Sequence, residues 1–229
     1  MNLEFLNQKS KEIRLKTIEY HKKHNTPHLG CDLSSVEIMT TLHYSCMKED
    51  DIFILSKGHA SGIYYIILND KGYISDEKMG KLEEHPTLNK KCGIHATTGS
   101  LGHGLSIGAG MAIADKKNKV FVLMGDGECD EGQVWEAARS ASELSLSNLI
   151  CIVDCNGFQG LKSTNNDNLG GKFEAFGWEV KKCDGHNCCS LLDTLNFGNK
   201  QPLVILASTI KGKGIPDIEN KLKSHYVSC

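Results

Sequence analysis

The chain lacks several features that assign a sequence to a particular class of protein. Only 4 of its 229 residues are proline, and no proline-rich linker, low-complexity tract or internal repeat divides it. No apolar run reaches the roughly 18 residues that span a bilayer. Residues 1–20 mix charged with apolar positions, unlike the apolar stretch of a signal peptide. These absences predict a cytoplasmic protein that forms one domain over residues 1–229 and has no membrane partner.

An excess of charge of one sign is also missing. The 26 Lys and Arg residues nearly balance the 28 Asp and Glu residues, which leaves a net charge of −2. This balance gives no general attraction to nucleic acid, so we expect no nucleic-acid partner. The ten cysteines are scattered and never form the C-x-x-C spacing of zinc or redox sites, which indicates reduced thiols inside a cell.

The hydrophobic pattern predicts the fold class. Apolar residues recur every three to four positions in five segments, which indicates helices. These segments are residues 2–24, 33–46, 59–69, 101–117 and 132–146. Between them lie three short apolar runs that are typical of buried strands, at residues 119–124, 149–153 and 202–207. The alternation predicts an α/β fold, a doubly wound parallel sheet flanked by helices, with a ligand at the carboxyl ends of the strands.

Glycines and polar residues gather where two of these strands end. The first strand runs into Gly125, Asp126 and Gly127, and the second is followed by Asn156. Carboxylate and amide oxygens are ligands that Mg²⁺ accepts beside diphosphate oxygens, and glycines let backbone amides approach an oxyanion. A lone G-D-G is also common in loops, and Asn-Gly is a common turn. The position of Asn156 after the next strand favours the metal interpretation.

The G-D-G sequence followed by Asn resembles the thiamine diphosphate motif, and the segments around it resemble transketolase. The matching segments before the motif are NTPHLGCDLSSVEI at 25–38, ILSKGHASGIYY at 54–65, EHP at 84–86 and GIHATTGSLGHGLSIGAGMA at 93–112. GDGECDEGQVWEA, VDCNGFQG, FGWEV, DGH and TIKGKG follow in the same order as in the family. The resemblance covers nearly the whole chain. It implies the diphosphate-binding domain of an enzyme that moves a two-carbon ketol unit from a ketose to an aldose.

The resemblance assigns roles to residues at the matching positions. The implied Mg²⁺ ligands are Asp126, the side chain of Asn156 and the backbone carbonyl of Phe158. The implied contacts to thiamine diphosphate are His59, Gly99, Ser100, Leu101, Asp126, Gly127, Asn156, Lys211 and His225. The implied catalytic residues are His28, His85 and His59, of which His28 and His85 match histidines that face the reacting sugar. A single histidine is more often a surface or core residue, and Lys211 could be one of many solvated lysines; the motif context favours the functional roles.

Four positions depart from the family pattern. Pro27 stands where the family usually has glycine, and because proline fixes φ and removes a donor it raises a question about the orientation of His28. His95 replaces the usual Glu, His103 replaces the usual Gln, and Tyr226 follows His225 in place of Gly. These departures indicate an unusual substrate or a paralogue that has lost turnover.

The resemblance also predicts a second chain. In the family, a glutamate that activates the cofactor lies in a separate pyrimidine-binding domain, and this sequence reaches Cys229 where the first domain would end. The arginines that usually hold a sugar phosphate also lie mostly in that other part, and this chain has only Arg14 and Arg139. We therefore expect a C-terminal transketolase subunit in an α₂β₂ assembly, acting on a sugar or sugar phosphate.

Three other functions compete with this prediction. One is a subunit of another thiamine diphosphate enzyme, such as a 1-deoxyxylulose-phosphate synthase-like or 2-oxoacid dehydrogenase-like protein. Another is a non-catalytic paralogue that keeps the fold. A dinucleotide-binding Rossmann enzyme is the weakest alternative, because no G-x-G-x-x-G follows an early strand.

Overall fold

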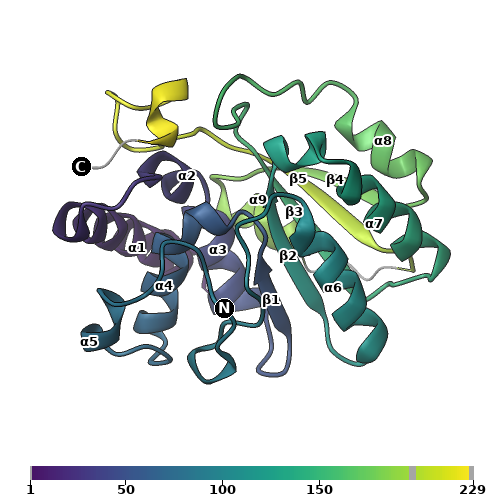
Figure 1. Ribbon diagram of the computed structural model, residues 1–229, viewed down its shortest axis with the longest axis horizontal. Helices are drawn as coiled ribbons and strands as arrows, with labels where there is room; N and C mark the ends of the chain where they lie inside the picture. The colour runs from purple at the N-terminus through teal and green to yellow at the C-terminus, as the bar shows by residue number, and fades with distance from the viewer. Residues whose placement is uncertain (1, 196–199, 227–229) are drawn as a thin grey trace.

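A parallel β-sheet forms the centre of the molecule (Figure 1). The computed structural model describes residues 2–195 and 200–226, except for the side chain of His225. The strands lie in the order β1-β2-β3-β5-β4, and every neighbouring pair is parallel. Their bounds are Ile52–Leu55 for β1, Val120–Gly125 for β2, Leu149–Cys155 for β3, Glu179–Asp184 for β4 and Leu203–Ser208 for β5.

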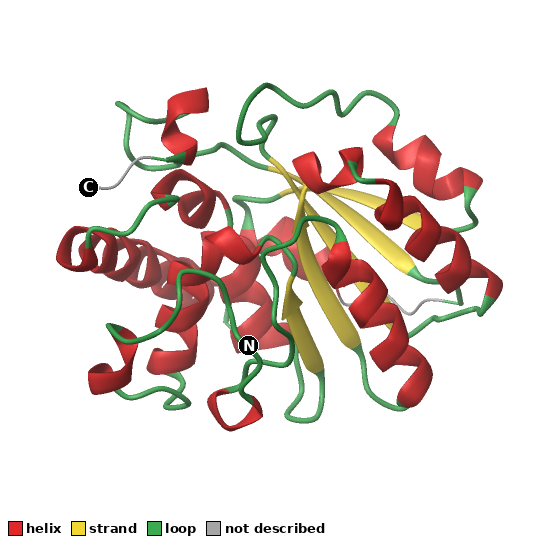
Figure 2. Cartoon of the chain, viewed as in Figure 1, coloured by secondary structure: helices red, strands yellow, loops and turns green. Residues whose placement is uncertain are grey.

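Helices flank the sheet on both faces (Figure 2). The α-helices are α1 Leu3–His24, α2 Leu29–Ser34, α3 Val36–Thr41, α4 Ser61–Asp70, α5 Asp76–Met79, α6 His103–Ala114, α7 Gly132–Glu143, α8 Leu169–Ala175 and α9 Cys188–Leu195. A π-helical turn, η1, covers Leu42–Cys46. Short 3₁₀ turns are η2 Gly58–Ala60, η3 Lys90–Cys92, η4 Asp126–Asp130 and η5 Leu222–His225. Among the described residues, no helix has the length and apolar character needed to cross a membrane.

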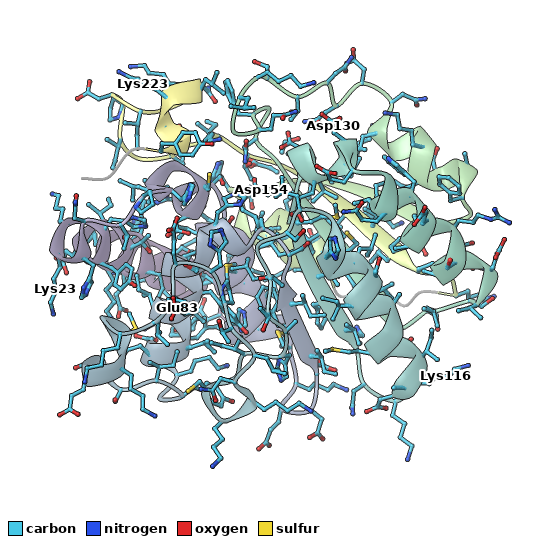
Figure 3. All side chains as sticks on the ribbon, viewed as in Figure 1. Lys23, Glu83, Lys116, Asp130, Asp154 and Lys223 are labelled. Atoms are coloured by element: carbon cyan, nitrogen blue, oxygen red, sulfur yellow. The ribbon has the colours of Figure 1, made fainter. Side chains whose placement is uncertain are left out.

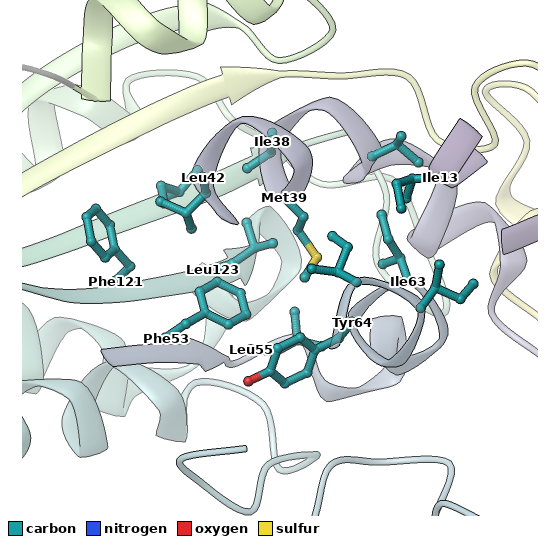
Figure 4. Packing of buried hydrophobic residues seen from close by; sticks show 14 of the residues in the cluster. Ile13, Ile38, Met39, Leu42, Phe53, Leu55, Ile63, Tyr64, Phe121 and Leu123 are labelled. Carbon is teal, nitrogen blue, oxygen red and sulfur yellow. The ribbon is translucent and has the colours of Figure 1, made fainter. Parts of the chain in front are cut away.

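The side-chain alternation of the strands creates two core layers. In β2, Phe121 and Leu123 face one layer, whereas Val120, Val122 and Met124 face the other. The first layer packs against α1, α3, α4 and α9, and Figure 4 shows part of it around the labelled side chains of Phe53 and Tyr64. The second layer packs against α6, α7 and α8. The doubly covered parallel sheet predicted from the sequence is confirmed.

Helix α6 approaches the sheet closely because glycines lie on its inner face. A Cβ at Gly108 would lie 2.5 Å from the Cγ2 atom of Val122, and one at Gly104 would lie 2.3 Å from the Cβ atom of Ser56. Gly104 is in the first turn of α6 and Ser56 directly follows β1. The close packing therefore brings the start of α6 next to the carboxyl end of β1.

Most predicted elements are present, but one predicted helix is broken, and two strands and the short helices α5, α8 and α9 were not predicted. The prediction of one continuous helix over residues 33–46 is wrong, because Ser35 separates α2 from α3. The hydroxyls of Ser34 and Ser35 bond to the Cys31 carbonyl and to buried Asp154, and such side-chain bonds compete with a regular helix. The sequence also missed β1, which is only four residues long, and β4, an edge strand in which lysines interrupt the apolar pattern.

The cysteines among the described residues are free thiols, most of them buried, as the scattered spacing predicted. Segment 157–171 is largely a loop, and α8 begins only at Leu169. Because parallel strands end at the same edge of the sheet, the residues that follow β1, β2 and β3 meet there. That edge carries the candidate site.

Candidate functional site

A cavity of about 230 Å³ opens at the carboxyl ends of β1, β2 and β3. Residues that follow each of these strands line the cavity, together with Cys31 of α2, Leu101 in the turn before α6 and Tyr226 of the C-terminal segment. Five residues predicted from the sequence share this lining: His59, Leu101, Gly127, Asn156 and Phe158. The structure therefore brings together residues that are nearly 100 positions apart in the chain.

Asp126 lies between two glycines, Gly125 and Gly127, that both line the cavity, and it is 2% exposed. Its Oδ2 atom accepts hydrogen bonds from the Gly157 amide at 2.8 Å, the Thr164 hydroxyl at 2.7 Å and the Asn166 amide at 2.6 Å. Burial raises the pKa of Asp126, although the bonds from Asn166 and Thr164 oppose the rise. A buried carboxylate held by neutral donors favours a nearby cation.

Asn156 is 7% exposed at the end of β3, and both ends of its amide are held. Its Nδ2 atom donates to Asp154 at 3.3 Å, and its Oδ1 atom accepts from the Phe158 amide at 3.1 Å. Between them, Gly157 adopts φ +81° and turns the chain so that its own amide reaches Asp126. This glycine turn therefore couples the ends of β2 and β3.

The residues at these two strand ends fit Mg²⁺ in their chemistry. Among the described residues, no group of three or more His, Cys, Asp and Glu side chains is arranged to hold a metal. The predicted set is of a different kind, because it combines one carboxylate, one amide oxygen and one backbone carbonyl with oxygens that a diphosphate would supply. Hard oxygen ligands with few protein carboxylates are the usual environment of Mg²⁺ bound with a phosphate ligand.

A buried ion pair lies in the wall of this cavity, which Lys57 helps to line. Lys57 and Asp154 have side chains 1% and 0% exposed, and their charged groups are in contact. The Lys57 ammonium also donates to the Cys31 carbonyl and the Ser35 hydroxyl, both at 3.0 Å. Burial opposes both charges, but the partner's charge outweighs it, so the pKa of Lys57 is raised and that of Asp154 is lowered. Figure 3 places Asp154 near the middle of the molecule.

The sequence analysis did not identify this pair. The available signal was the position of Lys57 two residues before His59 and of Asp154 two residues before Asn156, which places both at strand ends. The pairing itself joins residues 97 positions apart and could not be inferred from either segment alone. Since Asp154 accepts from Asn156, the pair supports one of the predicted metal ligands.

Glu128 is a second buried residue that the sequence analysis missed. It is 1% exposed, and its carboxylate accepts from the Ser56 hydroxyl at 2.6 Å, the Gly102 amide at 2.9 Å and the Gly125 amide at 2.8 Å. Burial raises the pKa of Glu128 despite these three bonds. The carboxylate ties the ends of β1 and β2 to the turn before α6. Its position two residues after Asp126 was the signal that could have indicated it.

The three predicted catalytic histidines form a cluster beside the cavity. The ring of His28 lies 5.5 Å from that of His59 and 6.4 Å from that of His85, measured between centroids. His28 has φ 72° and directly follows Pro27, yet its ring still faces the other two histidines. Pro27 therefore does not turn His28 away from the cluster.

The predicted backbone stretch lies beside this cluster. A Cβ at Gly99 would lie 3.0 Å from the Cδ2 atom of His85, and one at Gly58 would lie 2.9 Å from the Gly99 amide nitrogen. Gly99 thus fits between His85 and the residue before His59. Leu101 reaches the cavity, whereas Ser100 is exposed in the turn that precedes α6.

Lys211 and the C-terminal segment complete the surroundings of the candidate site. Lys211 is 0% exposed, and its ammonium lies 5.8 Å from the centroid of the Phe158 ring. Burial lowers its pKa, and the charge of Lys57 adds to this effect. The turn η5 packs on α2, where a Cβ at Gly30 would lie 2.6 Å from the Ser224 carbonyl oxygen. The predicted side chain of His225 lies outside the described residues.

The remaining departures from the family pattern differ in their relation to the site. The Tyr226 ring lies 5.7 Å from the His28 ring and lines the cavity. His103 is an exposed residue at the start of α6. The Nδ1 atom of His95 bonds to the Phe53 carbonyl at 3.2 Å, which places His95 beside β1. Of these three, only Tyr226 contacts the histidine cluster in the described part of the chain.

Comparison with known proteins identifies the family. Residues 6–228 match the family described as transketolase, thiamine diphosphate binding domain. The chain is 41% identical to one of the subunits of apulose-4-phosphate transketolase from Actinobacillus succinogenes, over 96% of this chain and 90% of that one. It is 36% identical to the 6-deoxy-6-sulfo-D-fructose transketolase subunit SqwG of Clostridium sp., over the same shares of both chains.

Comparison with a solved structure supports the same family. The transketolase from Campylobacter jejuni matches with a TM-score of 0.91 and 27% identity, over 100% of this chain and 41% of that chain. The present chain thus spans less than half of that transketolase, but nine tenths of the two separate subunits above. With the diphosphate-binding motif, the sheet and the site all in the matched region, this chain belongs to the transketolase family and is a subunit that carries its thiamine diphosphate-binding domain.

Proposed function

We propose that this chain, as one domain over residues 1–229, binds thiamine diphosphate and Mg²⁺ and acts with a C-terminal subunit. Together they transfer a two-carbon ketol unit from a ketose or ketose phosphate to an aldose. The observation that carries the proposal is the coupling of Asp126 and Asn156 through Gly157 at the edge of a cavity that also contains His59. A ligand position at the carboxyl ends of parallel strands is the usual one in such folds.

At this edge, Asp126, the amide oxygen of Asn156 and the carbonyl of Phe158 would hold Mg²⁺, which neutralises diphosphate charge. Thiamine diphosphate supplies the electron sink for the chemistry when it is bound. The chain itself contributes position and charge. Lys211 adds a cation near Phe158, and the backbone at Gly127 can approach an oxyanion without interference from a Cβ atom.

The histidine cluster is assigned to the sugar. His28, His59 and His85 can each donate or accept a hydrogen bond, and sugar hydroxyls need both kinds of partner. The buried pair of Lys57 and Asp154 keeps the amide of Asn156 oriented, so the metal end of the site is preorganised before any ligand binds.

The partner is also a proposal. The two most informative relatives are named as subunits, and this chain covers nine tenths of each. We propose that a C-terminal transketolase subunit with the pyrimidine-binding domain covers the cavity, that the assembly is α₂β₂, and that it functions in the cytoplasm. Sugar phosphates are the proposed substrates, with the phosphate held by the partner.

Calorimetric titration of thiamine diphosphate with Mg²⁺ tests the proposal. The titration uses this chain alone, the chain mixed with its C-terminal subunit, and both repeated with Asp126→Asn. Loss of the carboxylate should weaken binding by at least about 100-fold, since even the loss of an outer-shell partner typically costs 10–100-fold. Asp167→Asn, an exposed aspartate in the loop before α8, is the matched control and should bind as the wild type does.

Turnover separates the remaining alternatives. With the partner present, a ketose donor should be consumed and pyruvate should not; the reverse would assign the chain to another class of thiamine diphosphate enzyme. Cofactor binding without turnover of any donor would assign it to a non-catalytic paralogue. Failure of the intact assembly to bind the cofactor would overturn the proposal.

A further inference from the structure

Glu84 contacts the histidine cluster through its side chain. Its Oε1 atom lies 3.1 Å from the Nε2 atom of His28, and the side chains of His28 and Glu84 are 9% and 51% exposed. A carboxylate can only accept hydrogen bonds, so this contact places a proton on Nε2. Glu84 therefore selects the tautomer and the ring orientation of a histidine that faces the sugar.

The backbone that carries Glu84 is fixed by α4. The Ser61 hydroxyl donates to the Glu84 carbonyl, and the Tyr65 hydroxyl donates to the Glu83 carbonyl at 2.9 Å. Ser61 and Tyr65 are buried and lie one turn apart on the same face of α4. A segment without regular secondary structure is thus anchored at two points, while the Glu84 carboxylate remains at the surface of the site.

Glu84 also lines a second cavity of about 250 Å³. His59 belongs to the walls of both this cavity and the one at the strand ends, so the two adjoin at the cluster. Among the described residues, the lining of the second cavity includes Glu83 and Glu84 but no Lys or Arg. Of the histidines in this lining, His21 is already paired with the buried Asp32, so a phosphate, sulfonate or carboxylate placed there would meet the charges of Glu83 and Glu84 without a Lys or Arg to compensate them.

From these contacts we infer that Glu84 is a positioning and specificity-determining residue. It fixes His28, and its charge restricts the space beside the cluster to the neutral, hydroxylated part of a sugar, excluding anionic groups. The inference rests on the proposed function. It specifies that the end of the site with the histidine cluster accepts the neutral, hydroxylated part of a sugar. An anionic group of the substrate must then lie at the other end, away from Glu84.

The first test uses this chain alone. Nitrogen-15 NMR of the imidazoles reports which ring nitrogen of His28 carries the proton, and His28→Gln assigns the signal. Glu84→Ala should convert a single Nε2-protonated form into a mixture of tautomers, whereas Glu83→Ala should leave the form unchanged. Glu83 is the matched control because it is the adjacent carboxylate on the same anchor and has no hydrogen bond from its side chain to His28 among the described residues.

The second test uses the assembled enzyme with two donors, the neutral ketose xylulose and the anionic hydroxypyruvate. Glu84→Gln should lower the ratio of KM for hydroxypyruvate to KM for xylulose by about fivefold, a modest change for a half-exposed charge. The kcat values should change less, because the residue acts on binding. Glu84→Asp, which keeps the charge, should retain the wild-type ratio, and Glu83→Gln measures the general effect of removing a nearby charge.

An unchanged His28 tautomer in Glu84→Ala overturns the positioning role, and equal effects of Glu84→Gln and Glu83→Gln on the KM ratio overturn the specificity role. Both results are distinct from failure of the proposed function, which would appear as an intact wild-type assembly that does not bind thiamine diphosphate. The NMR test needs neither partner nor cofactor, so it gives a result in either case.

Discussion

The proposed site has two ends, the metal end with the predicted Mg²⁺ ligands and the sugar end with the histidine cluster, and they are built differently. The metal end rests on the sheet: Asp126, Asn156, Lys57 and Asp154 are all buried and tied to one another or to adjacent strand ends by hydrogen bonds. The sugar end rests on helix ends and irregular segments: His28 is buried, His59 and His85 are partly exposed, and the side chain of Glu84 is 51% exposed. The proposed metal end is therefore preorganised by the fold, whereas the proposed sugar end is less constrained at Glu84.

Breaking the buried ion pair is the most severe test of this contrast. Lys57→Met leaves the Asp154 charge buried without its partner, which should cost about 3–5 kcal/mol of unfolding free energy. Urea denaturation of the purified chain measures the loss. The exposed pair of Arg139 and Glu143, with side chains 69% and 61% exposed, provides the control. Arg139→Met should cost at most about 0.5 kcal/mol.

A double variant distinguishes an unpaired charge from lost packing. Lys57→Met combined with Asp154→Leu removes both charges and should recover at least half of the stability that the single variant loses. If the double variant is as unstable as the single one, the pair stabilises the metal end through packing. The claim that its paired charges distinguish the metal end from the sugar end would then be wrong.

Two glycines of α6 provide a matched test, with an expected effect on stability of intermediate size. Gly108→Ala places a methyl group against Val122, where a Cβ would lie only 2.5 Å from Cγ2, and should destabilise the chain by about 1–3 kcal/mol. Gly110→Ala, on the same helix, places its methyl group where nothing lies within 4 Å. It should stabilise the chain by about 0.5–1 kcal/mol through helix propensity.

Thermal and urea unfolding of the two glycine variants measure this difference. Opposite signs at Gly108 and Gly110 would show that close packing of α6 supports the sheet edge on which the metal end rests. Equal destabilisation by both would mean that the helix surface facing solvent is also constrained.

The smallest effect is expected beneath the sugar end, at His21. Its Nε2 atom lies 2.6 Å from the Oδ2 atom of Asp32, and both side chains are buried. Burial opposes the charged imidazole, but the hydrogen bond and charge of Asp32 outweigh it, so the pKa of His21 is raised above 6.5. Protonated His21 therefore contributes stability that is fully present below pH 6.5 and is lost as the pH rises through the raised pKa.

Urea denaturation over a pH series measures this linkage. The unfolding free energy of the wild type should fall as the pH rises above 6.5, and His21→Gln should flatten that part of the profile. His103→Gln, at the exposed start of α6, should leave the profile as it is in the wild type. A wild-type profile that rises over this range would contradict the assigned direction.

Much of the fold was predictable from local patterns. The period of the apolar residues located α1, α4, α6 and α7, and short apolar runs located β2, β3 and β5. Strand β4 was missed because its lysines hide the pattern that its buried neighbour β5 shows clearly. The break at Ser35 was missed because it depends on a hydrogen bond to Asp154, which is distant in the sequence.

By itself, the sequence determined the fold class and the residues at the two strand ends, because hydrophobic periodicity and the G-D-G and Asn motifs are local properties of the chain. Only the tertiary structure revealed the pair of Lys57 and Asp154, the three bonds of Glu128 and the contact of Glu84 with His28. Apart from the bond between Glu128 and the nearby Gly125, each of these joins segments far apart in the chain. Their interactions depend on which strand and helix ends meet in space, and this is set by the packing of the whole sheet.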